Sequence, residues 1–133
     1  MYYMMRGRAG DNWRTDTWIA GIFEGWFDPC PLDPEWEIDG LTSVWPDQRV
    51  FINPPYSNPK PWVKRAIDHP KTVVLLLKHD TSTEWYRMLH EAGAKFLLVN
   101  GRLKHGSGVG CAFPSVLAVL ECCLLYTSPS PRD

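Results

Sequence analysis

The sequence lacks the features that mark a membrane protein, a secreted protein or a zinc protein. No apolar run approaches the roughly 20 residues that a membrane-spanning helix needs, and the amino terminus has no apolar core of a signal peptide. The four cysteines, Cys30, Cys111, Cys122 and Cys123, form no CxxC pair, and the four histidines are scattered. We therefore expect a cytoplasmic protein with no metal site and no disulfide framework.

An excess of positive charge is also missing. The 133 residues carry a net charge of -1, so any contact with DNA must come from a local cluster of cations. One such cluster comprises Lys60, Lys64, Arg65 and Lys71, in which Lys60 and Lys64 are candidate DNA contacts. The alternative is the solvated face of a helix. The length and the hydrophobic fraction of 44% fit one globular domain.

A short apolar run that ends in Asn-Pro-Pro-Tyr is the most informative stretch of the sequence. Residues 50–52, Val-Phe-Ile, are typical of a buried strand. Proline cannot continue a central strand, so the chain must leave the sheet near Pro54. We therefore expect Asn53 and Tyr56 at the carboxyl end of this strand, where open α/β sheets bind ligands.

The groups in this loop suit a nucleobase that carries an exocyclic amine. The side-chain oxygen of Asn53 and the main-chain oxygen of Pro54 can accept both hydrogens of that amine, which makes its nitrogen nucleophilic without a strong base. Tyr56 offers a flat face on which a base can stack, a contact worth about 1–3 kcal/mol. The sequence therefore indicates a flipped-out base as the substrate. The alternative is a proline-rich turn in which Tyr56 only packs.

The motif Asn53-Pro54-Pro55-Tyr56 matches the NPPY form of the catalytic motif of amino methyltransferases, which use S-adenosylmethionine and act on adenine or on protein glutamine. Further matches, in order, are Asp28-Pro29-Cys30, Asp39-Gly40-Leu41, Trp45, Trp62, residues 75–77, residues 81–85 and Gly101-Arg102-Leu103. From Trp13 to Glu121 the chain thus resembles the phage-type DNA N-6-adenine methyltransferase family. The resemblance implies methylation of a flipped-out adenine in double-stranded DNA, in a phage, prophage or restriction-modification setting.

The same resemblance implies a cofactor site near the amino terminus. The family's opening segment reads W-x-T-P, but here Asp16 stands in place of the proline. The family also replaces the usual glycine-rich turn with a DPC-type sequence, and Asp28 is the candidate partner of the cofactor's cationic amino group. The alternatives are a helix cap for the opening segment and simple turns at Asp28 and Asp39. The predicted cofactor residues are Trp13, Thr15, Asp28, Pro29, Cys30 and Asp39.

Two further segments are candidate DNA contacts. Asp80 and Thr81 match a polar stretch that the family keeps at the end of a strand, where it could touch DNA or shape the pocket. Arg102 and Lys104 lie in an arm before a glycine-rich hairpin tip and are candidate phosphate contacts. For the first segment the simpler interpretation is a helix cap by Ser82 or Thr83.

The periodicity of apolar residues predicts one α/β domain. We expect helices at 13–23 and 84–92, and strands at 25–27, 50–52, 72–77, 95–99 and 115–120. A further short helix should have Trp62, Val63, Ala66 and Ile67 on one face and end near His69-Pro70. These elements indicate an abbreviated Rossmann-like methyltransferase fold, with a mostly parallel sheet, helices on both faces and a C-terminal antiparallel hairpin.

The ends of the chain are expected to lie outside this domain. Residues 1–12 are interpreted as a loose lead-in and residues 13–122 as the domain. Residues 123–133 match the translation of a transposase adapter used in sequencing libraries, so we expect a non-native tail and a missing native C-terminus. Two other functions stay open: an amino methyltransferase acting on protein glutamine or an RNA base, and a non-catalytic DNA-binding fragment.

Overall fold

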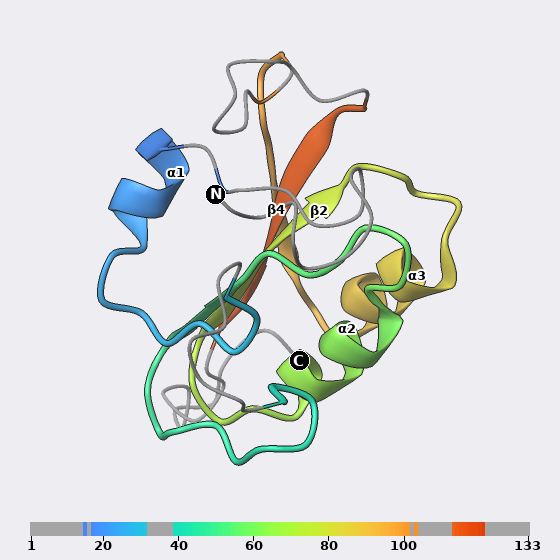
Figure 1. Cartoon of the computed structure of the whole chain (residues 1–133). Helices are drawn as coiled ribbons and strands as arrows, with labels where there is room; N and C mark the ends of the chain where they lie inside the picture. Colours follow the sequence, from blue (N-terminus) through green and yellow to red (C-terminus); the bar gives the residue numbers. More distant parts are fainter. Residues whose placement is uncertain (1–14, 16, 32–38, 102, 104–112, 122–133) are drawn as a thin grey trace, which may run out of the picture.

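A four-stranded sheet with helices packed on both faces forms the described part of the protein (Figure 1). This computed structural model describes residues 15, 17–31, 39–101, 103 and 113–121. The expected lead-in 1–12 and the expected tail 123–133 lie outside these residues. The elements are α1 (Thr17–Ile22), β1 (Val50–Ile52), α2 (Lys60–Ile67), β2 (Val73–Lys78), α3 (Glu84–Glu91), β3 (Lys95–Leu98) and β4 (Ser115–Leu120).

The sheet is mixed, with the strand order β1-β2-β4-β3. Strands β1 and β2 are parallel and are connected through α2. Strand β4 runs antiparallel to both of its neighbours, β2 and β3. The expected mostly parallel sheet is therefore not confirmed among the described strands, because β4 returns between β2 and β3. The expected antiparallel pair near the C-terminus is present, with β3 at the edge of the sheet.

The strand expected at 25–27 is reduced to a single parallel bridge between Phe27 and Val50. Two main-chain hydrogen bonds form this bridge, from Phe27 N to Arg49 O (3.0 Å) and from Phe51 N to Phe27 O (2.9 Å). Because Asp28 and Pro29 follow at once, the chain turns away after one residue. The bridge nevertheless places the Asp28 turn beside β1.

Strand β2 is buried on both faces, as its uninterrupted apolar run predicts. Successive side chains of a strand point to opposite faces. Val73, Leu75 and Leu77 pack in the cluster that contains α2 and α3, whereas Val74 and Leu76 pack in the cluster that contains Ile19 of α1. The sheet therefore has an α2/α3 face and an α1 face, and the expectation of helices on both faces is confirmed for the described chain.

Local sequence signals are found at the starts of α3 and α2. The side chain of Thr83 accepts a hydrogen bond from Tyr86 N at 3.2 Å and caps α3, which confirms the cap expected from Ser82 or Thr83. Pro61 stands in the first turn of α2, where its missing N–H costs nothing. No described helix is both long and apolar enough to cross a membrane.

Candidate active site

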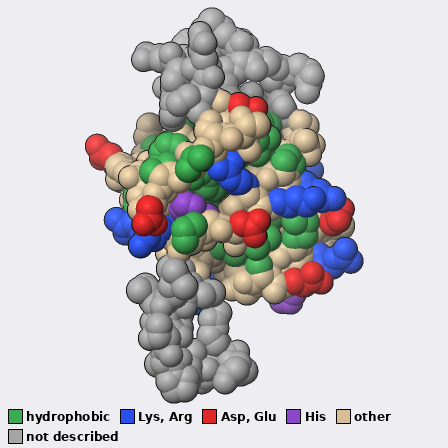
Figure 2. All heavy atoms as spheres, turned by 90° about the horizontal axis from the view of Figure 1, so that it is seen from below, with side chains coloured by type: hydrophobic (Ala, Val, Ile, Leu, Met, Phe, Trp, Pro, Cys, Tyr) green, Lys and Arg blue, Asp and Glu red, His purple; other side chains and the backbone are tan. Residues whose placement is uncertain are grey.

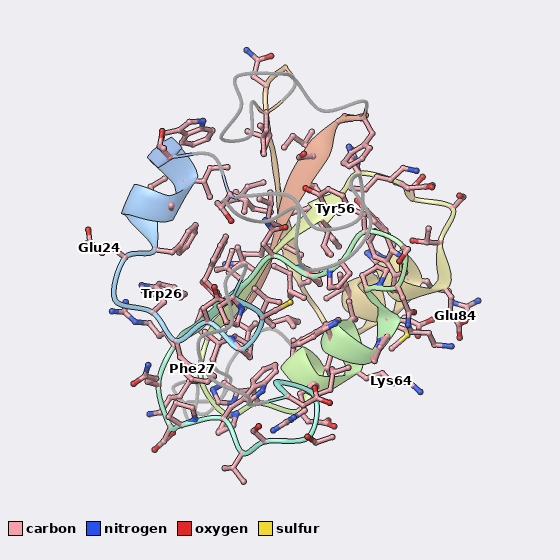
Figure 3. The ribbon with its side chains drawn as sticks, in the orientation of Figure 1. Glu24, Trp26, Phe27, Tyr56, Lys64 and Glu84 are labelled. Carbon is pink, nitrogen blue, oxygen red and sulfur yellow. The ribbon has the colours of Figure 1, made fainter. Side chains whose placement is uncertain are left out.

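The Asn-Pro-Pro-Tyr loop lies at the carboxyl end of β1. Asn53 follows directly after the last residue of the strand, and Pro54 is fully buried. The chain leaves the sheet at this point, as the prolines predict. Figure 3 shows Tyr56 at the same end of the sheet as the carboxyl end of β2. The loop therefore occupies the rim where ligands bind in open α/β sheets.

The amide of Asn53 is oriented by the segment that precedes α1. Its Nδ2 atom donates a hydrogen bond to Thr15 Oγ1 at 3.0 Å. Because the amide nitrogen is directed to Thr15, the side-chain oxygen, which is the acceptor end of the group, is directed away from it. Thr15, predicted as a cofactor residue, thus contacts the predicted catalytic residue directly.

Tyr56 packs edge-on against Phe113, with ring centroids 4.7 Å apart and an interplanar angle of 89°. Phe113 in turn lies under the ammonium group of Lys78, whose Nζ is 5.6 Å from the ring centroid. Sequence reasoning missed both Phe113 and Lys78. The available signal was topological, because an antiparallel β4 brings its amino end to the rim where β1 and β2 have their carboxyl ends.

Ser115 is a buried polar residue at the same rim. It is only 2% exposed, and its hydroxyl has no hydrogen-bond partner among the described residues. A buried hydroxyl without a partner costs about 1–3 kcal/mol. Such groups are uncommon in folded proteins, so this hydroxyl is a site at which substitution can be tested.

The two predicted cofactor segments, at Asp28 and Asp39, lie against each other. Gly40 packs so closely on Pro29 that a Cβ atom at position 40 would lie 1.9 Å from Pro29 O. The carboxylate of Asp28 accepts from Cys30 N at 2.9 Å, and that of Asp39 accepts from Leu41 N at 2.9 Å. Both aspartates thus form the turns that the alternative interpretation predicts, and Cys30 is buried. Trp13 lies outside the described residues.

Arg65 holds the loop that follows Asp39. Its guanidinium donates to Gly40 O at 3.2 Å, to Leu41 O at 2.8 Å and to Ser43 O. It also stacks on the Trp45 ring, 4.6 Å from the centroid. Arg65 therefore has a structural role rather than the surface role that its charge cluster indicated.

The two predicted DNA contacts of α2 differ in their surroundings. Lys60 forms an ion pair with Glu84 at 2.9 Å, and this ammonium lowers the pKa of the Glu84 carboxyl. Lys64 projects outward from α2 (Figure 3). Lys71, from the same charge cluster, lies 3.9 Å from Asp47.

The polar segment after β2 forms a turn. The Asp80 carboxylate accepts from Ser82 Oγ at 2.6 Å and from Ser82 N at 3.0 Å. These hydrogen bonds lower the pKa of Asp80. Thr81 is exposed beside it. The candidate phosphate contacts Arg102 and Lys104 lie outside the described residues.

The opposite end of the sheet is a mixed surface. Figure 2 views the molecule from that end and shows Lys and Arg side chains interspersed with Asp and Glu rather than gathered in one patch. A hollow of about 220 Å³ lies there, lined by Val44, Trp45, Arg65, Asp68, His69 and Pro70. Within the described ranges, no three His, Cys, Asp or Glu side chains come together as metal ligands.

Comparisons with known proteins identify the family. The family model of DNA N-6-adenine-methyltransferase (Dam) matches residues 5–110. The DNA N-6-adenine-methyltransferase of Haemophilus phage HP1 is 36% identical over 59% of this chain and 56% of that protein. A protein of the same name from Escherichia phage T1 is 27% identical over 70% of this chain and 46% of that protein.

The chain spans about half the length of these two curated relatives. No solved structure matches it significantly. The family match covers most of the described residues, including β1, the Asn-Pro-Pro-Tyr loop and β2. This chain belongs to the phage-type DNA N-6-adenine-methyltransferase (Dam) family.

Proposed function

We propose that the protein methylates the exocyclic amino nitrogen of adenine in double-stranded DNA, with S-adenosylmethionine as the methyl donor. The observation that carries the proposal is the placement of Asn53 and Pro54 at the end of β1, with the Asn53 amide nitrogen bound to Thr15. Family membership and the names of the two phage relatives support the same reaction.

The chemistry proposed for this loop is positioning. Asn53 Oδ1 and Pro54 O accept the two hydrogens of the adenine amine, so its lone pair turns away from the ring and toward the donor. The new N–C bond would form as the sulfur–methyl bond of the bound donor breaks, with the neutral thioether as leaving group, and the amino nitrogen would then lose one proton to water. Positioning of this kind can contribute about 7–11 kcal/mol to catalysis. No general base is required.

The acidic side chains beside β1 fit a site for S-adenosylmethionine. Bound there, the cofactor would supply an electrophilic methyl group. Its cationic amino group needs a carboxylate, and Asp28 stands next to β1 through the Phe27 bridge. The Asp39 turn is held against the Asp28 turn by the contact between Gly40 and Pro29. We assign Asp28, Pro29, Cys30 and Asp39 to this site, together with Trp13 and Thr15. Thr15 also orients Asn53.

The finer fold that we propose is an abbreviated Rossmann-like methyltransferase fold. Its support is the parallel unit formed by β1, α2 and β2, which the Phe27 bridge extends on the side of β1. Cofactor and base would then lie side by side along the carboxyl ends of neighbouring parallel segments.

Methylation inside a duplex requires the adenine to leave the stack. Tyr56 would stack on the extruded base, a contact worth about 1–3 kcal/mol. The residues that we propose as DNA contacts around it are Lys60, Lys64, Asp80, Thr81, Arg102 and Lys104. Because Lys60 already pairs with Glu84, its contact with DNA would require exchange of that partner.

The test is nucleoside analysis of host DNA after expression of the wild-type protein and of two variants. Asn53→Ala should abolish N6-methyladenine while leaving binding of S-adenosylmethionine, measured by calorimetry, largely intact. Asn58→Ala is the matched control, since Asn58 is an exposed asparagine in the same loop, and it should keep wild-type methylation.

Three outcomes would contradict the proposal. Undiminished methylation by Asn53→Ala would remove the assigned role of the amide. Transfer of label from the cofactor to protein glutamine or to RNA, but not to DNA, would identify another substrate class. Absence of any heat of cofactor binding would indicate a DNA-binding module without catalysis.

A further inference from the structure

Lys78 is a cation at the proposed base site to which the proposed function gives no role. It is the last residue of β2 and is exposed. Strands β1 and β2 are parallel, with Ile52 opposite Leu75. Lys78 therefore lies about 7 Å further along the strand direction than the level of Asn53. Its ammonium group lies 5.6 Å from the centroid of the Phe113 ring, which in turn contacts Tyr56 of the loop that would hold the base.

The side chain of Lys78 lies on the same face of the sheet as that of Asn53. Because side chains alternate in direction along a strand, Lys78 shares a face with Leu76, and Asn53 shares a face with Phe51. Leu76 and Phe51 pack in the same cluster, so the two faces are one. The hydrogen bond from Asn53 to Thr15, just before α1, agrees with this assignment. So does the position of Lys78 Nζ over Phe113, which packs with the same cluster.

Lys78 has no carboxylate partner in the described part of the chain, unlike Lys60, Lys71 and Lys95, which pair with Glu84, Asp47 and Glu121. Its nearest acidic neighbour in sequence, Asp80, turns its carboxylate to Ser82. The contact of Lys78 with Phe113 is a cation–π contact at an exposed site, which leaves the donors of the ammonium accessible.

We infer that Lys78 binds a backbone phosphate of the DNA strand that carries the target base. A nucleotide whose base stacks on Tyr56 brings its own phosphates to this rim. The ammonium group of Lys78 lies over Phe113, and the Phe113 ring contacts Tyr56. The net charge of -1 gives the protein no general attraction for DNA, so a cation beside the base contributes locally. This inference rests on the proposed function.

The experiment measures the affinity for a DNA duplex at several salt concentrations. Each phosphate neutralised by a cation contributes about 0.9 to the slope of log K against log salt. Lys78→Met should therefore reduce the slope by about 0.9, and Lys78→Arg should keep it. Lys71→Met is the matched control, because it removes the same charge just before the other end of β2. It should leave the slope unchanged.

Two results would overturn the inference alone while wild-type binding and methylation persist. One is an unchanged slope in Lys78→Met. The other is an equal loss of slope in Lys71→Met, which would show a general effect of net charge. Failure of the wild-type protein to bind DNA at low salt would overturn the proposed function as well, so the two failures are distinguishable.

Discussion

Asn53 and Thr15, 38 residues apart in the sequence, are joined by a hydrogen bond of 3.0 Å from the amide nitrogen to the threonine hydroxyl. The bond connects the Asn-Pro-Pro-Tyr loop to the segment that enters α1. It directs the amide nitrogen to one side and the amide oxygen to the other, and so it makes the orientation of Asn53 depend on a residue outside its own loop.

Thr15→Val keeps the shape of the side chain but removes the acceptor. We expect kcat for DNA methylation to fall by about two- to tenfold, which corresponds to the ~0.5–1.5 kcal/mol of one hydrogen bond. Thr15→Ser retains the hydroxyl and should stay near wild type. The measurement is steady-state methylation of a duplex with labelled cofactor. Equal rates in the two variants would show that the bond does not position the amide.

Gly40→Ala should destabilise the fold. The new Cβ would meet Pro29 O at 1.9 Å, and overpacking of this kind costs about 1–3 kcal/mol. Gly21→Ala is the matched control, because Gly21 is exposed in α1 and a methyl group there would have no neighbour within 4 Å among the described residues. It should instead stabilise by about 0.5–1 kcal/mol. Urea denaturation followed by circular dichroism measures the free energy of unfolding of each variant. Changes of opposite sign agree with the prediction, and equal changes contradict it.

Ser115→Ala removes the buried hydroxyl that has no partner among the described residues. The free energy of unfolding should stay level or rise by up to about 1 kcal/mol, since the penalty of an unpaired polar group disappears with the group. Thermal unfolding by calorimetry is the measurement. A clear loss of stability would mean that the hydroxyl is satisfied in solution.

The pair formed by Lys60 and Glu84 should be visible in the acid titration of the protein. Because the pKa of Glu84 is lowered in the folded state by the Lys60 ammonium, the pair stabilises the fold above the unfolded pKa. That contribution is lost as the pH falls through the lower folded pKa. It is small, since the side chains are 39% and 55% exposed.

An NMR titration of the Glu84 carboxyl carbon tests this assignment. Lys60→Met should return the pKa of Glu84 toward its ordinary value. Lys64→Met should move it less, because Lys64 lowers the pKa of that carboxyl less than Lys60 or Arg87 does. A larger shift in Lys64→Met would contradict the assignment of the pair.

The elements around the Asn-Pro-Pro-Tyr loop were predictable because each depends on local pattern. Strand β1 has the predicted bounds, and β2 and α3 differ from their predicted bounds by one residue at one or both ends. The apolar run of β2 indicated burial on both faces, and Thr83 carried the capping signal for α3. In these segments neighbouring residues alone determine the local structure.

The remaining features depend on contacts between distant residues. Nothing in residues 115–120 indicates that they pair with β2 as well as with β3, so the place of β4 inside the sheet could not be predicted. Likewise, the charge of Arg65 indicated a position on the surface. Its guanidinium instead donates hydrogen bonds to three main-chain carbonyls that lie 22–25 residues earlier in the sequence. Pattern within a segment carries no information about such partners.

The place of β4 in the sheet also sets an order of assembly. Strand β2 is bonded to β1 on one side and to β4 on the other, and β4 is the last of the described strands to leave the ribosome. The central strand therefore has an open, strongly apolar edge until residue 120 has been synthesised. Nascent chains halted before β4 should be captured by chaperones or aggregate, while chains extended past it should close the sheet.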